Sequence, residues 1–179
     1  MTNTELEYFL ETINTDQLCN DLFLNTETNK NKGSKYQNFI YDYIKNAIEK
    51  KELKGEIYNI TDGDYPVFWL KTGYKIKFGG TENAKGFDLV YVYKEVVQPI
   101  QCKAHVLKSN LKGFIEQIDH LKKSGIPYSK PLLVSCHNVN YNSRKFKTLS
   151  TCKNCLIMIN KNSDDTNSND TNSSDCKIF

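Results

Sequence analysis

Apolar residues along the chain recur at two spacings, one typical of helices and one typical of strands. Helical spacing predicts a helix over residues 34–51, with Ser34 as its N-cap. A second helix is predicted over 106–124, where Gly125 supplies a stop signal. A weaker pattern of the same kind predicts an earlier helix over residues 4–23. These segments form the helical part of the expected fold.

Short apolar runs predict the strands. GFDLVYVY (86–93) and VVQPIQCKA (96–104) are separated by a tight reversal and are expected to pair. Pro99 has no amide hydrogen, so the first half of the second strand is expected at a sheet edge. The run PLLVSC (131–136) is apolar throughout, as in a sheet buried on both faces. Less regular patterns predict strands at 56–60, 67–74 and 156–160, and a short helix at 143–149.

The succession of helices and strands indicates an α/β domain with a mixed central sheet of four to five strands flanked by helices. A length of 179 residues suits one domain. We expect an acidic helical extension over 1–32, the folded domain over 33–160 and a tail over 161–179. The tail contains NSDDTNSNDTNSSD, which has no apolar residue and is predicted to be disordered.

No apolar run approaches the roughly 20 residues that a membrane-spanning helix needs. The acidic start MTNTELEYFLETINTDQ lacks the basic and apolar regions of a secretory signal. The protein is therefore predicted to be intracellular, in the cytoplasm or nucleus, with no membrane partner, and not secreted. Its six cysteines are accordingly expected to be reduced.

Cys152 and Cys155 have the spacing of half a zinc site. No second pair has matching spacing, and His137 alone does not complete a set of four ligands. A turn that leads into a strand is therefore the favoured interpretation, ahead of a metal site. Cys102 and Cys136 lie within apolar runs, where a free cysteine packs as a small hydrophobic residue.

Charge is unevenly distributed along the chain. The net charge is +3 overall, but it is −3 over residues 1–35, +8 over 36–160 and −2 over 161–179. A basic central region suits a polyanionic partner such as DNA. A solvated, lysine-rich surface explains the same excess, and charge alone does not choose between the two.

The segment GGTENAKGFDLVYVYKEVVQPIQCKAH (79–105) carries the candidate chemistry. Side chains alternate along a strand, so Gln101, Lys103 and His105 share one face. The hairpin brings Asp88 beside the first two, and carboxylate and amide oxygens are ligands that Mg²⁺ prefers. Such a metal activates water, and a nearby lysine stabilises charge on a phosphodiester. A loop aspartate and a lysine that extends to solvent explain the same residues without a site.

The glycines and the two motif-bearing strands resemble a known family. Gly-Gly, five residues and Gly-Phe-Asp-Leu-Val, followed by Ile-Gln-Cys-Lys, resemble the core of the restriction endonuclease-like PD-(D/E)xK nucleases. The resemblance is to the Mrr-like branch, in which the lysine motif is QxK. In that family a helix precedes the hairpin, and a helix and an apolar strand follow it. The predicted elements match this order over about residues 33–160.

The resemblance implies a restriction endonuclease-like core and a metal-dependent DNA endonuclease. Asp88 and Gln101 would hold Mg²⁺, or Mn²⁺ in its place, with the backbone carbonyl of Cys102 as a third ligand. Lys103 would be the catalytic lysine. DNA is the implied partner, and many members of the family act as homodimers that cut both strands.

The family often carries an acid on the first helix, where this chain has Gln37. Unless Glu56 or Asp42 takes its place, Asp88 is the only carboxylate, and the affinity for metal is expected to be low. A catalytically inactive DNA-binding module on the same fold is therefore a second hypothesis. A third is a protein-interaction scaffold whose basic middle binds another protein.

Lysines close to the motif would hold the DNA backbone. Aromatic residues between lysines around Trp69 suit nucleic-acid contact, and they suit equally a sheet face with a solvated lysine edge. A histidine at a strand end would contact phosphate, although a hydrogen-bonded structural histidine is the simpler interpretation. The candidate DNA-contacting residues are Lys71, Lys75, Lys77, His105, Lys108 and Lys112.

Overall fold

A computed structural model describes residues 4–24, 28–75, 87–105, 111–137 and 143–154. These residues form a five-stranded mixed sheet flanked by five α-helices, which confirms the predicted α/β class. The helices are α1 (Glu5–Glu11), α2 (Asp16–Leu24), α3 (Asn29–Glu49), α4 (Tyr65–Thr72) and α5 (Lys112–Ser124). The strands are β1 (Glu56–Asn59), β2 (Leu89–Tyr93), β3 (Val96–Lys103), β4 (Leu132–Ser135) and β5 (Lys147–Ser150). None of the described helices is long and apolar enough to cross a membrane.

The strands lie in the sheet in the order in which they occur along the chain. β1, β2 and β3 are antiparallel, and Leu89 of β2 lies between Asn59 and Ile100. β4 runs parallel to β3, and β5 runs parallel to β4. The start of β2 and the carboxyl ends of β3, β4 and β5 therefore lie at the same end of the sheet, and Asp88 is at that end.

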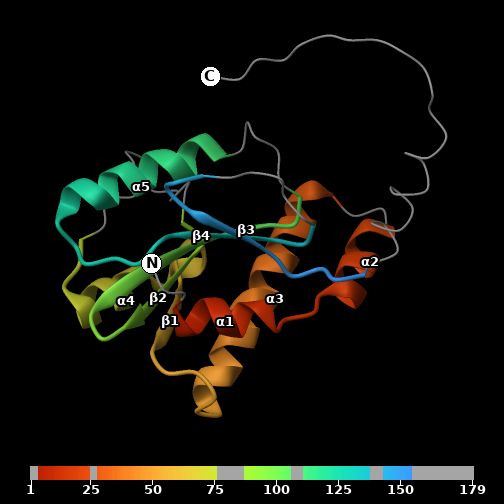
Figure 1. Cartoon of the computed structure of the whole chain (residues 1–179), viewed down its shortest axis with the longest axis horizontal. Helices are drawn as coiled ribbons and strands as arrows, with labels where there is room; N and C mark the ends of the chain where they lie inside the picture. Colours follow the sequence, from red (N-terminus) through yellow and green to blue (C-terminus); the bar gives the residue numbers. More distant parts are fainter. Residues whose placement is uncertain (1–3, 25–27, 76–86, 106–110, 138–142, 155–179) are drawn as a thin grey trace, which may run out of the picture.

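Two apolar clusters hold the helices to the sheet. The first joins α1, α2 and α3 to one face and includes Tyr36, Ile100 and Cys102. The second joins α4 and α5 to the other face and includes Phe68 and Phe114. Figure 1 shows this layering, with α5 on one side of the sheet and α1 and α3 on the other. The N-terminal helices α1 and α2 thus share a core with the sheet.

Pro99 lies within β3, an interior strand of the sheet. On one side β3 pairs with β2 from Val96 to Ile100. On the other side its ladder with β4 begins at Ile100, and Val97 instead bonds the segment that precedes β4. The regular parallel ladder therefore starts only after the residue that has no amide hydrogen.

The first three helices differ from the predicted ones at their ends. α3 begins at Asn29 and is capped by Thr28, so the N-cap predicted at Ser34 is wrong. The reason is that its first turns are polar, and the apolar spacing that indicates a helix begins only at Tyr36. This helix crosses the boundary expected between residues 32 and 33. The single helix predicted over 4–23 is two helices, α1 and α2.

The strand predicted over 67–74 is wrong, because this segment forms α4 and the turn after it. Pro66 occupies the first turn of the helix, and Gly73 ends it in the left-handed conformation, at a φ of 72°. The apolar run does not reveal the helix because some of its side chains are buried and others are exposed to solvent. Phe68 is fully buried, whereas Leu70 is 81% exposed.

The short helix predicted over 143–149 is also wrong, because Lys147–Ser150 form the edge strand β5. Parallel pairing with β4 supplies its backbone hydrogen bonds, and a local pattern does not reveal such a partner. Other predicted segments lie outside the described residues. They are residues 106–110 of the helix at 106–124, the strand at 156–160 and the tail at 161–179.

Candidate functional site

Asp88 and Gln101 are in direct contact at the carboxyl end of β3. Oδ2 of Asp88 accepts a hydrogen bond from Nε2 of Gln101 at 2.6 Å and from the amide of Cys102 at 2.8 Å. The backbone of Asp88 is held on both sides, because its amide donates to Ile100 and its carbonyl accepts from Ile60. The carboxylate is thus fixed in position by two strands.

Strand alternation places Gln101 and Lys103 on one face of β3 and Cys102 on the other, as predicted. Cys102 and Ala104 pack in the cluster beneath α1, α2 and α3. Gln101 is buried, and Lys103 is half-buried. The Lys103 ammonium lies close enough to Asp88 to favour ionisation of its carboxyl and so lower the pKa. The three residues predicted to act together are therefore brought together.

Burial is the largest influence on the pKa of Asp88 and raises it to about 6, from an ordinary value of 3.8. The Cys102 amide, the Lys103 charge and the Gln101 amide all lower this pKa, but together they do not offset the burial. A cation beside the carboxylate would favour the ionised form in the same way as Lys103 does. A further cation at this site would therefore lower the pKa of Asp88.

Oε1 of Gln101 is buried and has no hydrogen-bond partner. Leaving a buried acceptor unpaired costs roughly 1–3 kcal/mol. Turning the amide over would not remove the cost, because it would place an oxygen against the Asp88 carboxylate. Oε1 thus offers a lone pair beside a carboxylate, as a cation or an ordered water requires.

Gln37 lies on α3 over the end of β1. Its Nε2 donates to Oδ1 of Asn59 at 2.9 Å and to the hydroxyl of Thr61. Between these two residues, the amide of Ile60 donates to the carbonyl of Asp88. Gln37 is therefore linked to the Asp88 site through residues 59–61, at and after the end of β1. The described residues show no direct bond from it to the Asp88 carboxylate.

The structure places neither of the two alternative acids against Asp88. Glu56 begins β1, at the end of that strand away from Asp88, and pairs with Lys71 at 3.3 Å. Asp42 is exposed on α3. Among the described residues, the groups that influence the pKa of Asp88 include Lys103 and no second carboxylate. Asp88 is thus the carboxylate that the geometry places beside Gln101 and Lys103.

Two of the candidate DNA-contacting lysines lie on or after α4. Lys71 pairs with Glu56. The ammonium of Lys75 lies 4.9 Å from the centre of the Trp69 ring. Trp69 is 41% exposed, so this aromatic–lysine pair is accessible from solvent.

The other two candidates within the described residues are His105 and Lys112. His105 is exposed, and its ring centre lies 6.3 Å from that of His137. Lys112 pairs along α5 with Glu116, at 3.9 Å. The last two candidates, Lys77 and Lys108, lie outside the described residues.

The first cysteine of the possible zinc motif has a different partner. Cys152 is buried, and its thiol donates to Oδ1 of Asp16 at 3.1 Å, an oxygen that also accepts from the next two backbone amides. Cys155 lies outside the described residues. Within the part of the chain that the structure describes, no group of three or more His, Cys, Asp and Glu side chains is placed to hold a metal ion. A metal at Asp88 would therefore depend on amide, backbone and water oxygens.

The structure adds two residues that sequence patterns did not single out. Asn59 is 4% exposed at the end of β1, and Thr61 follows it; both bond Gln37. Asn59 could have been noticed in the sequence as an amide residue at the end of a short strand.

No protein-family model, curated protein or solved structure matches the chain.

Proposed function

We propose that the protein is a metal-dependent DNA endonuclease that hydrolyses phosphodiester bonds at Asp88, Gln101 and Lys103. The observation that carries this proposal is the buried Oε1 of Gln101, which has no partner and adjoins a carboxylate. A lysine stands on the same face, two residues further along β3. A carboxylate, an open amide oxygen and an ammonium together suit a divalent cation bound beside a phosphate.

The donors fit a hard cation such as Mg²⁺ or Mn²⁺. Asp88 would contribute a carboxylate oxygen and Gln101 its Oε1. The amide of Cys102 points at Asp88, and the N–H and C=O of one strand residue lie on the same side of the strand. The Cys102 carbonyl is therefore on the side of the carboxylate. One carboxylate with neutral oxygens predicts weak binding, with waters as the remaining ligands.

A bound Mg²⁺ would supply a water of lowered pKa and neutralise charge on the phosphate. Lys103 would hold a phosphate oxygen and stabilise the negative charge that develops during hydrolysis. Gln101 keeps the Asp88 carboxylate oriented, because its Nε2 binds one of the carboxylate oxygens. The backbone bonds of Asp88 hold this arrangement at this end of the sheet.

The choice of DNA as substrate has two supports. The region 36–160 carries a net charge of +8, which favours a polyanion. The order α3, β2, β3, α5 and β4 agrees with the order that the resemblance to PD-(D/E)xK nucleases implies. DNA is preferred to RNA on that resemblance alone.

Plasmid nicking tests the proposal. The purified chain is expected to nick supercoiled plasmid with Mg²⁺ or Mn²⁺ and not with EDTA. Asp88→Ala is expected to lower the rate by about a hundredfold or more, because the only charged ligand is removed. Asp42→Ala removes an exposed carboxylate from α3 and is the matched control. Metal-dependent nicking that persists in Asp88→Ala would overturn the assignment of the site.

A DNA-binding module without catalysis is the second candidate, and Gln37 favours it. Where the resembled family often carries an acid on this helix, the chain has the Gln37 amide, which bonds Asn59 and Thr61 and brings no negative charge. Plasmid that is retarded on a gel, yet not nicked with any metal, would favour this candidate.

Restoring a carboxylate at residue 37 is expected to strengthen metal binding. Gln37→Glu adds a negative charge on the helix that contacts β1 beside Asp88. We expect about tenfold tighter Mn²⁺ binding by calorimetry, since an opposite charge close to the cation is worth on the order of 1 kcal/mol or more. Gln17→Glu makes the same change at an exposed position of α2 and should leave the affinity unaltered. Equal affinities in both variants would exclude residue 37 from the site.

A further inference from the structure

A cavity of about 1010 Å³ opens at the end of the sheet opposite to Asp88. It lies between α1, α5, the segment before β4 and the start of β5. Tyr128 on its wall pairs with Val97, whereas Asp88 contacts Gln101. From Val97 to Gln101 the strand extends about 13 Å. The cavity is therefore separate from the Asp88 site, and its size lies near the upper end of the usual range for ligand pockets.

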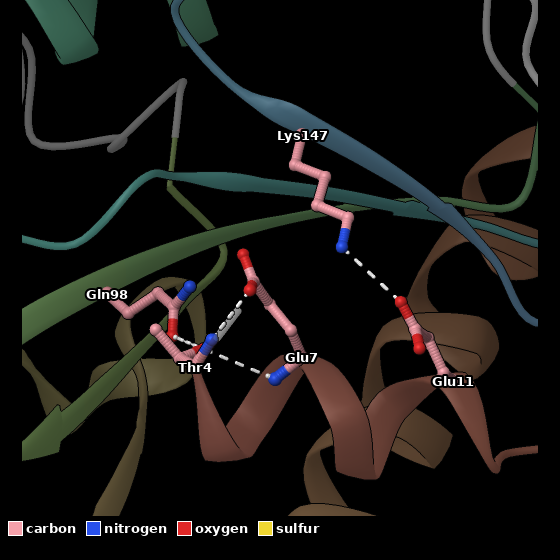
Figure 2. Close-up of polar contacts among 5 residues, drawn as sticks. All are labelled: Thr4, Glu7, Glu11, Gln98 and Lys147. Carbon is pink, nitrogen blue, oxygen red and sulfur yellow. Dashed lines mark hydrogen bonds and ion pairs between the residues drawn. The ribbon is translucent and has the colours of Figure 1, made fainter. Parts of the chain in front are cut away.

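Positive charges dominate the walls of the cavity. Lys145 pairs with Asp119 at 2.9 Å, and Lys147 pairs with Glu11 at 3.3 Å (Figure 2). Three further cations line the cavity without an ion-pair partner among the described residues: Lys122, Lys130 and Arg144. A guanidinium and ammonium groups that converge on one cavity are the groups with which proteins hold phosphate.

A buried carboxylate also lines the cavity. Glu7 is 4% exposed and belongs to α1, where its amide donates to Oγ1 of Thr4. Its Oε2 accepts from the Thr4 amide at 2.7 Å, and Thr4 in turn donates to Gln98. Oε1 has no hydrogen-bond partner among the described residues. Figure 2 shows the Glu7 carboxylate directed from α1 toward the strands, apart from the Lys147–Glu11 pair.

We propose that this cavity binds a nucleotide, with its phosphates on Lys122, Lys130 and Arg144 and an N–H of its base on Glu7. The unpaired cations favour an anionic ligand, and the open oxygen of the Glu7 carboxylate can accept a hydrogen bond from a donor. Inorganic phosphate would engage the cations and not Oε1 of Glu7, and a simple amine would engage Glu7 and not the cations. A nucleotide carries both groups, and Tyr128 is an aromatic residue in the cavity wall, the type of side chain on which a base stacks.

Calorimetry in EDTA tests this site apart from the metal chemistry. The probes are GTP, ATP, inorganic tripolyphosphate and a 5′-phosphorylated single-stranded pentanucleotide. Each is titrated into the full chain and into Asp88→Ala protein, which should bind equally well if the cavity is the site. Lys130→Ala and Arg144→Ala are each expected to weaken nucleotide binding about tenfold. Lys123→Ala, an exposed lysine of α5 outside the cavity lining, is the matched control.

Glu7→Gln separates a nucleotide site from a simple anion site. Glutamine also serves in the capping box of α1, so the helix should persist, while an amide NH2 group replaces the open oxygen. The variant is expected to bind nucleotide about tenfold more weakly. It should bind tripolyphosphate as before or slightly more tightly, because a negative charge is removed from the cavity. Tighter binding of the triphosphates supports a free nucleotide, and tighter binding of the pentanucleotide supports a nucleotide within a strand. No binding at about 1 mM, or tripolyphosphate equal to nucleotide in both proteins, would overturn the proposal.

Discussion

Lys103→Ala is expected to lower the rate of plasmid nicking by about a hundredfold to a thousandfold, the usual cost of removing one group that stabilises developing charge. Lys103 shares a face of β3 with Gln101, and its charge acts on Asp88. Its loss should leave metal binding intact or slightly tighter, because a positive charge beside the cation is removed. In this variant the rate of nicking should therefore fall while the affinity for Mn²⁺ does not.

Single-turnover nicking and calorimetry with Mn²⁺ measure the two properties. Lys112→Ala is the control, because that lysine is exposed and pairs only along its own helix with Glu116. Lys103→Arg keeps the charge and should recover part of the rate if the role is electrostatic. An Lys103→Ala protein that nicks at the wild-type rate would remove Lys103 from the mechanism, even if Asp88 proved essential.

The contact between Asp88 and Gln101 could be predicted because it depends on local rules. A tight reversal pairs two strands, and alternation within a strand puts Gln101 and Lys103 on one face. These rules involve residues close together in the sequence. The α/β class followed in the same way, from elements of clear periodicity.

Contacts that depend on tertiary packing could not be predicted from the sequence. β5 lacks a pattern of its own and is a strand because β4 offers an unpaired edge. The bonds from Gln37 to Asn59 and Thr61 join residues that only the packing of α3 on β1 brings together. Glu7 is the extreme case, since the hydrogen bond from Thr4 to Gln98 places it beside residues of the β4 and β5 region.

Asp88→Asn is expected to stabilise the protein at pH 7.5 in EDTA, by up to about 3 kcal/mol. The pKa of Asp88 is raised to about 6 by burial, from 3.8, and each unit corresponds to about 1.4 kcal/mol. Between these two values the folded protein holds the proton and the unfolded chain has lost it, so stability from this residue falls as pH rises. Above pH 6 the penalty is complete, and asparagine removes it while keeping an acceptor for Gln101 and Cys102.

Urea unfolding at pH 4 and pH 7.5 measures this effect. The variant and the wild type should have similar free energies of unfolding near pH 4, where Asp88 holds its proton for much of the time even in the unfolded chain. Asp42→Asn, at an exposed position, is the control and should show little change at either pH. A variant that is less stable than the wild type at pH 7.5 would contradict the prediction.

Adding Mn²⁺ should then reverse the advantage of the variant. A cation that binds only the folded wild type stabilises it by about 2.7 kcal/mol at a hundred times its dissociation constant, close to the penalty that ionised Asp88 imposes. Asp88→Asn has lost the charged ligand and should gain little. If the difference in free energy of unfolding between variant and wild type closes with Mn²⁺, a cation offsets the free-energy cost of the buried carboxylate. A difference that persists at saturating Mn²⁺ would leave Asp88 as a destabilising residue without a metal, contrary to the proposed function.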